Sequence, residues 1–398
     1  MTHTTFVADR VFTGLHPELI SNGAVTLSGE QIVYVGPAGD APEGGERVEL
    51  GDLTLMPGLI DMHVHLTFSG TETVVEDYLN DSDQMRLIRG VDNARRAIMA
   101  GITTVRECGG RNELVFALRD AARRGIIPAP RIIAAGGSIT TTGGHCWFFG
   151  VEADSEDDLR RAVRGQVKAG ADYIKIMATG GALTPRTNPV EPQYSQAQLE
   201  AVVEEANRLG KLRVSAHCHG TAGVLYAARA GVTTIEHCSF QTPNGYVYDE
   251  EAANAVVEAK CYVCPTIGIA ERASQNVPAD HRLAVMKRVM MPQRIANLKR
   301  LHERGVPFVS GSDAGVTLTP FQDFAYNVTI LVDSVGMSPY EALQTTTTIA
   351  AEALARPDLG ALEVGRAADV IAVRGNPLEN INAIWDVEMV MGGGVRYR

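Results

Sequence analysis

The hydrophobic positions of the chain follow two alternating patterns from about residue 59 onward. Short apolar runs typical of buried parallel strands are each followed by a longer stretch in which apolar residues recur at helical spacing. The runs that predict strands are residues 59–65, 103–108, 131–136, 172–178, 213–219, 233–239, 261–266 and 307–312. The stretches that predict helices are residues 84–100, 112–124, 156–169, 195–209, 221–230, 249–259 and 282–304. Such a series of strand–helix units indicates an α/β fold, a (β/α)8 TIM barrel.

The two ends of the chain have a different pattern. Short alternating strands are expected at residues 5–11, 23–27, 31–35, 47–49 and 54–56, and again at residues 368–373, 381–385 and 387–397. Neither end has a core of its own. We therefore expect residues 1–57 and 364–398 to form one small β-sandwich domain with a structural role, beside a barrel of residues 58–363.

Composition and charge narrow the possible partners. The 398 residues provide room for one large barrel and a small accessory domain. The net charge of −11 argues against a nucleic-acid or anionic membrane surface. No apolar run reaches transmembrane length and the first residues lack the pattern of a signal peptide, so we expect a cytoplasmic protein. Cys261 and Cys264 have the spacing of a redox or zinc motif, but they face opposite sides of a strand, which favours a structural role.

Side chains that bind metals lie at the ends of the expected strands. His63 and His65 are two residues apart, so both project from one face of their strand. Six of the ten histidines lie in or beside strand ends, and these are His63, His65, His145, His217, His219 and His237. Barrel enzymes carry their chemistry at the carboxyl ends of the strands, where imidazole and carboxylate groups suit zinc or a similar first-row ion.

Each of these residues, taken alone, has a structural explanation. A single strand histidine such as His237 is usually half-buried and hydrogen-bonded, a lone Lys175 is usually a surface lysine with a buried stem, and Asp313 would cap a turn. Lys175, however, lies between two isoleucines in a strand, where an isolated charged amine is costly. The order of these residues on successive strand ends therefore favours a metal centre.

The motifs resemble those of the amidohydrolase superfamily. The resemblance rests on residues 56–65 (Met-Pro-Gly-Leu-Ile-Asp-Met-His-Val-His), Lys175, the later histidines, Gly311-Ser-Asp313, and the closing segments 365–369 and 375–378. Within the superfamily the chain is similar to bacterial dipeptidases and amidases related to Xaa-Pro dipeptidases, through residues 104–110, 143–145, 175–181 and 216–220.

This resemblance implies a site for two divalent metal ions, with zinc the expected metal. His63, His65 and Asp313 would hold one ion, His217 and His237 the other, and Lys175, carboxylated by carbon dioxide, would bridge them. Burial favours the neutral amine that reacts with carbon dioxide. A water between the ions would become hydroxide near neutral pH. Asp313 would accept its proton and pass it to the leaving amine.

The resemblance also assigns substrate contacts. His219 shares the strand face of His217 and would donate a hydrogen bond to the developing oxyanion. His145 would bind a substrate carboxylate, with a loop histidine at a subunit contact as the alternative. Arg186, in the loop of residues 180–194, would meet an anionic substrate group, with a solvated arginine as the alternative. Glu107 stands where many relatives have Asp, which we interpret as a tolerated change beside the site.

The expected activity is metal-dependent hydrolysis of a C–N amide bond in a small molecule, a dipeptide or an N-acyl amino acid. A carbamate, a urea or a toxin amide would use the same machinery. Deamination of a heterocycle is disfavoured, because no acidic residue follows His217 before Glu236 and because Lys175 supplies a bridging ligand. A role in binding alone would require that at least one of the metal ligands be missing from the sequence, and none is missing. The resemblance to the relatives also implies a homo-oligomer.

Overall fold

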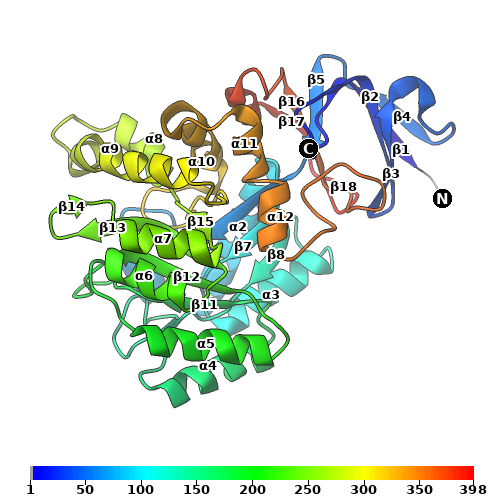
Figure 1. Ribbon diagram of the computed structural model, residues 1–398. Helices are drawn as coiled ribbons and strands as arrows, with labels where there is room; N and C mark the ends of the chain where they lie inside the picture. Colours follow the sequence, from blue (N-terminus) through cyan, green and yellow to red (C-terminus); the bar gives the residue numbers. More distant parts are fainter. Residues whose placement is uncertain (1–2) are drawn as a thin grey trace.

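The computed structural model describes residues 3–398, without the side chain of residue 282. The two ends of the chain join in one eight-stranded sheet with the order β18-β17-β16-β5-β1-β2-β3, in which β4 also pairs with β1. The strands are β1 (Thr4–Val11), β2 (Ile20–Ser28), β3 (Gln31–Pro37), β4 (Glu46–Glu49), β5 (Leu53–Pro57), β16 (Val370–Arg374), β17 (Val387–Gly392) and β18 (Val395–Arg396). Because β16 runs antiparallel to β5, the last strands complete the first sheet (Figure 1).

Association of the two ends is therefore confirmed, while the sandwich description and the domain borders stay predictions. One expected strand is wrong, because Ile381–Trp385 forms a 3-10 helix, η4. The Asn380 side chain accepts a hydrogen bond from the backbone N–H of Asn382 across 3.1 Å. Such local capping by asparagine favours a turn over an extended strand.

Between the ends the chain forms parallel strands followed by helices. One sheet contains β6 (Leu59–Val64), β7 (Ile102–Glu107) and β8 (Arg131–Ala134). The other contains β9 (Ile139–Thr140), β10 (Val151–Glu152), β11 (Ile174–Met177), β12 (Val214–Gly220), β13 (Thr234–Thr242), β14 (Gly245–Tyr246) and β15 (Tyr262–Cys264). Apart from the β13–β14 hairpin, the paired strands in these sheets are parallel. The expected α/β class is confirmed.

Backbone contacts link these two sheets at both edges. The Asp172 N–H donates to Ala134 O across 2.9 Å, which joins β8 to the start of β11. On the other side Val263 bridges to Phe308, and the Met62 N–H donates to Ser310 O across 2.9 Å. The expected strand 307–312 thus lies between β15 and β6, but it is present only as isolated bridges.

The α-helices are α1 (Val74–Asn80), α2 (Asp83–Met99), α3 (Asn112–Arg123), α4 (Glu156–Ala169), α5 (Gln196–Arg208), α6 (Thr221–Arg229), α7 (Glu250–Ala259), α8 (Glu271–Gln275), α9 (Arg282–Glu303), α10 (Ala325–Ile330), α11 (Pro339–Gln344) and α12 (Thr348–Ala353). The seven predicted stretches correspond to α2 to α7 and α9, each of which begins and ends within one residue of its predicted position, whereas α1, α8, α10, α11 and α12 were not predicted. Short turns of other helix types are η1 (Ala38–Asp40), η2 (Phe321–Asp323) and η3 (Leu331–Val335). Capping boxes at Ser155 and Ser195 fix the starts of α4 and α5, and left-handed Gly170 ends α4.

The terminal sheet is attached to the central strands through Asp369. Its carboxylate accepts hydrogen bonds from Arg131 Nη1 at 2.6 Å and from the Gly393 N–H at 2.7 Å, and its carbonyl accepts from the Gly58 N–H at 3.0 Å. Within residues 3–398, no helix is long and apolar enough to cross a bilayer. The cytoplasmic location and the homo-oligomeric state stay predictions.

Candidate metal centre

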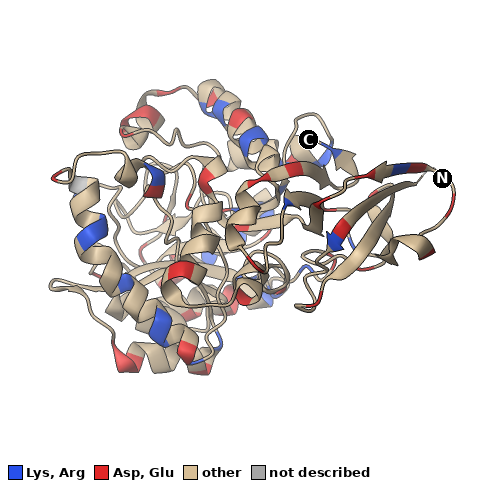
Figure 2. Ribbon diagram, turned by 90° about the horizontal axis from the view of Figure 1, so that it is seen from above, with Lys and Arg blue, Asp and Glu red and all other residues tan. Residues whose placement is uncertain are grey.

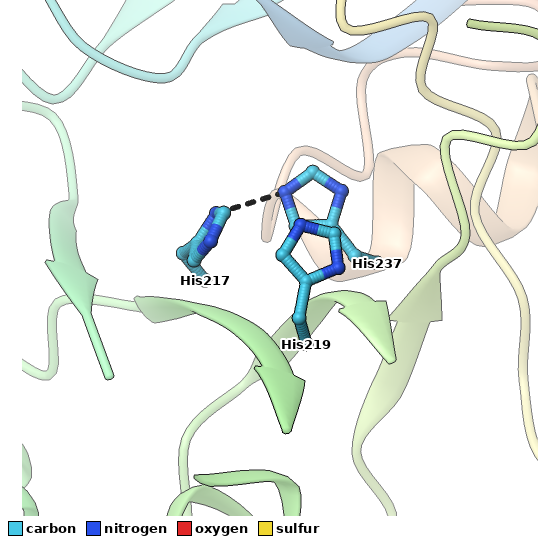
Figure 3. A group of neighbouring side chains, drawn as sticks. All are labelled: His217, His219 and His237. Atoms are coloured by element: carbon cyan, nitrogen blue, oxygen red, sulfur yellow. Dashed lines mark hydrogen bonds between the residues drawn. The ribbon is translucent and has the colours of Figure 1, made fainter. Parts of the chain in front are cut away.

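The predicted histidines gather at the carboxyl ends of β6, β12 and β13. The ring centroid of His63 lies 5.4 Å from that of His65 and 5.2 Å from that of His237. His237 in turn lies 4.5 Å from His217 and 4.4 Å from His219 (Figure 3). Strands far apart in sequence thus bring five imidazoles into one cluster.

A distortion of β13 allows neighbouring residues to reach the same site. His237 and Cys238 have positive φ angles of 65° and 43°, and the pairing of β12 with β13 shifts register between Cys218 and Gly220. In a regular strand Glu236 and His237 would face opposite sides. The irregularity redirects the chain, so both side chains contact the histidine cluster.

Asp313 is held beside the first two histidines. Its Oδ1 atom lies 3.4 Å from Nε2 of His63 and 3.4 Å from Nε2 of His65. Asp313 has a φ of 57°, and its N–H donates to His63 O across 2.7 Å. The buried carboxylate of Asp61 accepts from the N–H and hydroxyl of Ser312 at 2.9 and 2.5 Å, which fixes the loop that carries Asp313.

Lys175 projects from the middle of β11 and is only 2% exposed. Its Nζ atom is buried and has no hydrogen-bond partner among residues 3–398, and the same holds for Oδ1 of Asp313. Burial of such polar atoms without partners is costly. Metal ligation would satisfy both atoms, so these residues fit a metal centre.

The protonation states of the cluster also suit metal binding. Burial lowers the pKa of His63 to about 4, and the positive charge of Lys175 acts in the same direction. Burial holds the pKa values of His217 and His237 well below the usual range. Burial alone would raise the pKa of Asp313, but its electrostatic interactions with His63 and His65 lower it to about 2. Burial alone would lower the pKa of His65, but the nearby carboxylates of Asp313 and Glu107 raise it. Neutral His63, His217 and His237 beside an ionised carboxylate are the kind of ligands that zinc and similar ions require.

Glu236 orients His63 from behind. Its Oε2 atom lies 2.7 Å from His63 Nδ1, and its Oε1 atom accepts hydrogen bonds from Arg106 Nη2 at 2.5 Å and Ser215 Oγ at 2.6 Å. Because Nδ1 is occupied, Nε2 of His63 is the atom that faces Asp313. Neither Glu236 nor Arg106 was predicted from the sequence as a site residue. The proximity of Glu236 to His237 was a weak signal, while its pairing with Arg106 depends on the tertiary fold.

The second group contains three histidines. His237 Nε2 lies 2.9 Å from His217 Nδ1, shown as the dashed line in Figure 3, and His237 Nδ1 lies 2.7 Å from Thr266 Oγ1. The His219 ring stacks on that of His237 with an angle of 13°, and its Nδ1 lies 2.9 Å from Ser239 Oγ. Nitrogen atoms of His217, His219 and His237 lie within 4.8 Å of one another. His219 therefore lies close enough to His217 and His237 to bind the same metal ion.

The two residues predicted to bind an anionic substrate group differ in position. His145 is buried, its ring centroid lies 4.6 Å from that of His217, and its Nδ1 has no partner among residues 3–398. Arg186 is exposed and makes no ion pair or hydrogen bond with the described residues, so its contact with a substrate stays a prediction. Glu107 is buried, and burial raises the pKa of its carboxyl to about 7.

Aromatic side chains form an apolar wall against the ring of His65. The His65 ring stacks on Phe68 at 4.9 Å and lies 6.1 Å from Phe149. Phe68 and Phe149 pack with Tyr78 and Phe148 in one buried cluster. This wall keeps water from one side of the histidine cluster and fixes the plane of His65.

Comparisons with known proteins agree with this geometry. The chain is 30% identical to ochratoxinase from Aspergillus niger over 94% of its own length and 82% of that protein. It superposes on a Xaa-Pro dipeptidase with methionine bound in the active site, with a TM-score of 0.88, 30% identity and full coverage of both chains. A prolidase in complex with N-methylphosphonate-L-proline gives a TM-score of 0.86 and 28% identity over 99% of both chains. The model of the amidohydrolase family matches residues 54–396, and the chain therefore belongs to this family of hydrolases.

Proposed function

We propose that the protein is a metal-dependent hydrolase that cleaves the C–N amide bond of a dipeptide or an N-acyl amino acid. The observation that carries this proposal is Lys175, a buried amine without a hydrogen-bond partner among residues 3–398, on the strand that pairs with β12. Its charge acts on His63, His217, His237 and Asp313. The comparisons support it, since the similar proteins include a Xaa-Pro dipeptidase, a prolidase and an ochratoxinase.

The residues that would hold two divalent ions fall into two groups. His63, His65 and Asp313 would hold one ion and His217 and His237 the other, with a carboxylated Lys175 between them. Zinc is the expected ion, because imidazole and carboxylate donors suit it. Divalent ions in such a site would lower the pKa of water, so that a nucleophile is available near neutral pH.

The side chains of the protein would then move the protons. Asp313 is ionised, so it would accept a proton from the attacking water and return it to the leaving nitrogen. His219 can accept from Ser239 through Nδ1, which places its proton on Nε2 and allows it to polarise the substrate carbonyl. His145, buried beside His217, is available to a polar group of the substrate. Glu236 and Arg106 would keep His63 oriented throughout.

The same proposal extends to the architecture. We infer that the central strands close into a (β/α)8 barrel of residues 58–363, supported by the contact of Asp172 with Ala134 and by the bridge of Val263 to Phe308. A barrel would place all of the ligand-bearing strand ends at one face.

The experiment that tests the function combines metal analysis with hydrolysis assays. We would measure metal ions per chain and the release of free amino acids from dipeptides and N-acyl amino acids, for the wild type and for Lys175→Ala. We expect two ions and clear release for the wild type, and loss of bridged metal and nearly all hydrolysis for the variant. Full activity of Lys175→Ala with one ion would contradict the two-ion site. Two ions without release would redirect the search to carbamates, ureas and other non-peptide amides.

A further inference from the structure

Helix α9 and the β13–β14 hairpin lie together near the histidine cluster. The N–H of Tyr246, in β14, donates a hydrogen bond to Gln293 Oε1 of α9 across 3.0 Å. The charged residues of α9 are mainly basic (Figure 2), and Glu303 at its end is the one acidic residue in its sequence. The helix therefore brings positive charge to this side of the site.

Most basic residues around α8 and α9 have acidic partners. Lys287 lies 2.8 Å from Glu271, Arg272 lies 2.8 Å from Asp323, and Arg300 pairs with Glu250. These ion pairs connect the two helices to their surroundings and neutralise their charge locally.

Arg294 differs from these residues. It is half-buried, and within residues 3–398 its guanidinium has no carboxylate within ion-pair distance. Nη2 donates to Pro265 O across 2.7 Å, and the guanidinium lies 5.8 Å from the centre of the Tyr246 ring. The remaining N–H groups have no acceptor among the described residues. A partly buried cation without a counter-ion is costly, so this arrangement points to a ligand.

The position of Arg294 connects it to the metal centre. Pro265 immediately precedes Thr266, whose hydroxyl lies 2.7 Å from His237 Nδ1. After burial, the charge of Arg294 is the largest cause that lowers the pKa of His219, and the charge of Asp313 acts on Arg294. The guanidinium therefore lies on the side of the site that carries His219.

We propose that Arg294 forms a subsite that binds the carboxylate of the substrate. The inference rests on the proposed amide hydrolysis and selects substrates whose leaving amine carries a free carboxylate, namely dipeptides and N-acyl amino acids. A planar guanidinium with free N–H groups binds a carboxylate through two parallel hydrogen bonds. Tyr246 and Pro265 hold the plane of Arg294, so its direction is fixed before the substrate arrives.

The test compares matched substrates with the metal-loaded enzyme. A panel of N-acetyl-L-amino acids and their C-terminal carboxamides is assayed with the wild type and with Arg294→Gln. We expect kcat/KM for the acids to fall about 10- to 100-fold in the variant, while the carboxamides change less than about 2-fold. Arg294→Lys should restore part of the loss for the acids. Arg288→Gln, an exposed change on the same helix, serves as the control and should leave both substrates unaffected.

Two results would overturn the subsite. One is an equal loss of kcat/KM for acids and carboxamides in Arg294→Gln, and the other is no loss of kcat/KM for the acids. The subsite would also be overturned if His145→Asn removes the preference for acids while Arg294→Gln retains it. If the wild type hydrolyses neither the acids nor the carboxamides, the subsite is tested by calorimetry, which measures binding of the same acids to the wild type and to Arg294→Gln. Binding that is lost in Arg294→Gln would support the subsite and reject only the proposed hydrolysis, whereas no binding to the wild type would reject the subsite.

Discussion

Glu236 lies 2.7 Å from Nδ1 of His63 and holds this ring with Nε2 directed at Asp313. The glutamate is fully buried, and its charge is balanced by Arg106 and by the hydroxyl of Ser215. Burial alone would raise the pKa of Glu236, yet Arg106 and Lys175 hold it well below the usual range. Glu236 would therefore act on the proposed metal centre as an anion, through His63.

Replacing Glu236 with Gln should weaken metal binding without removing a ligand. The variant leaves Arg106 as a buried cation without an acidic partner and loosens the orientation of His63. Loss of such an orienting residue typically lowers metal affinity about 10- to 100-fold. Competition with a chelator would measure the affinity. Ser215→Ala removes a single hydrogen bond, from an uncharged hydroxyl, to the same carboxylate and should have a much smaller effect, so equal effects of the two variants would contradict the role assigned to Glu236.

The elements that the sequence predicts well are those with local signals. The helix 156–169 matches α4 at both ends because Ser155 caps its start and Gly170 ends it. The clustering of the histidines could be predicted because the ends of parallel strands meet at one edge of a sheet. Other features depend on tertiary structure, such as the positive φ angles of β13 and the absence of an acidic partner for Arg294. Within its helix, Arg294 follows the same polar pattern as the paired arginines, so the sequence carried no signal for it.

His219→Ala should separate the two roles that its position allows. If His219 polarises the carbonyl, the variant should lose turnover by about 100-fold, the typical effect of removing one such donor, while metal content stays near two ions per chain. Metal analysis and kcat measured on the same preparation test this. Loss of one ion would instead make His219 a ligand and assign the carbonyl contact to another residue, because its nitrogen lies within 4.8 Å of those of His217 and His237.

Glu205 should make stability depend on pH. This buried residue of α5 accepts hydrogen bonds from Arg208 at 2.5 Å and from Arg164 at 3.0 Å. The hydrogen bond from Arg208 is the largest cause that lowers its pKa from 4.5 to about 2. A lowered pKa means that the stabilisation is complete above pH 4.5 and is lost as the pH falls towards 2.

Glu205→Gln should therefore reduce the free energy of unfolding by roughly 2 kcal/mol at pH 7, and the difference from the wild type should shrink as the pH falls below about 4.5. Urea unfolding at pH 7 and near pH 3 measures both values. Glu204→Gln is the matched control, because Glu204 is exposed and, among residues 3–398, pairs only with Arg160, so its effect should stay below about 1 kcal/mol. A difference for Glu205→Gln that is constant with pH would contradict the assignment.

Asp369 should stabilise the attachment of the terminal sheet to the central strands. Asp369→Asn replaces an anion that accepts from Arg131 and from the Gly393 N–H, and it leaves Arg131 at the start of β8 without its acid. Because Asp369 is 7% exposed, the pair is poorly screened, and we expect a loss of about 1–3 kcal/mol in the free energy of unfolding. The metal ligands lie at the opposite ends of the strands from Arg131, so metal content should be unchanged. Thermal unfolding and metal analysis of the variant test both expectations, and loss of metal with normal stability would show that Asp369 supports the site directly.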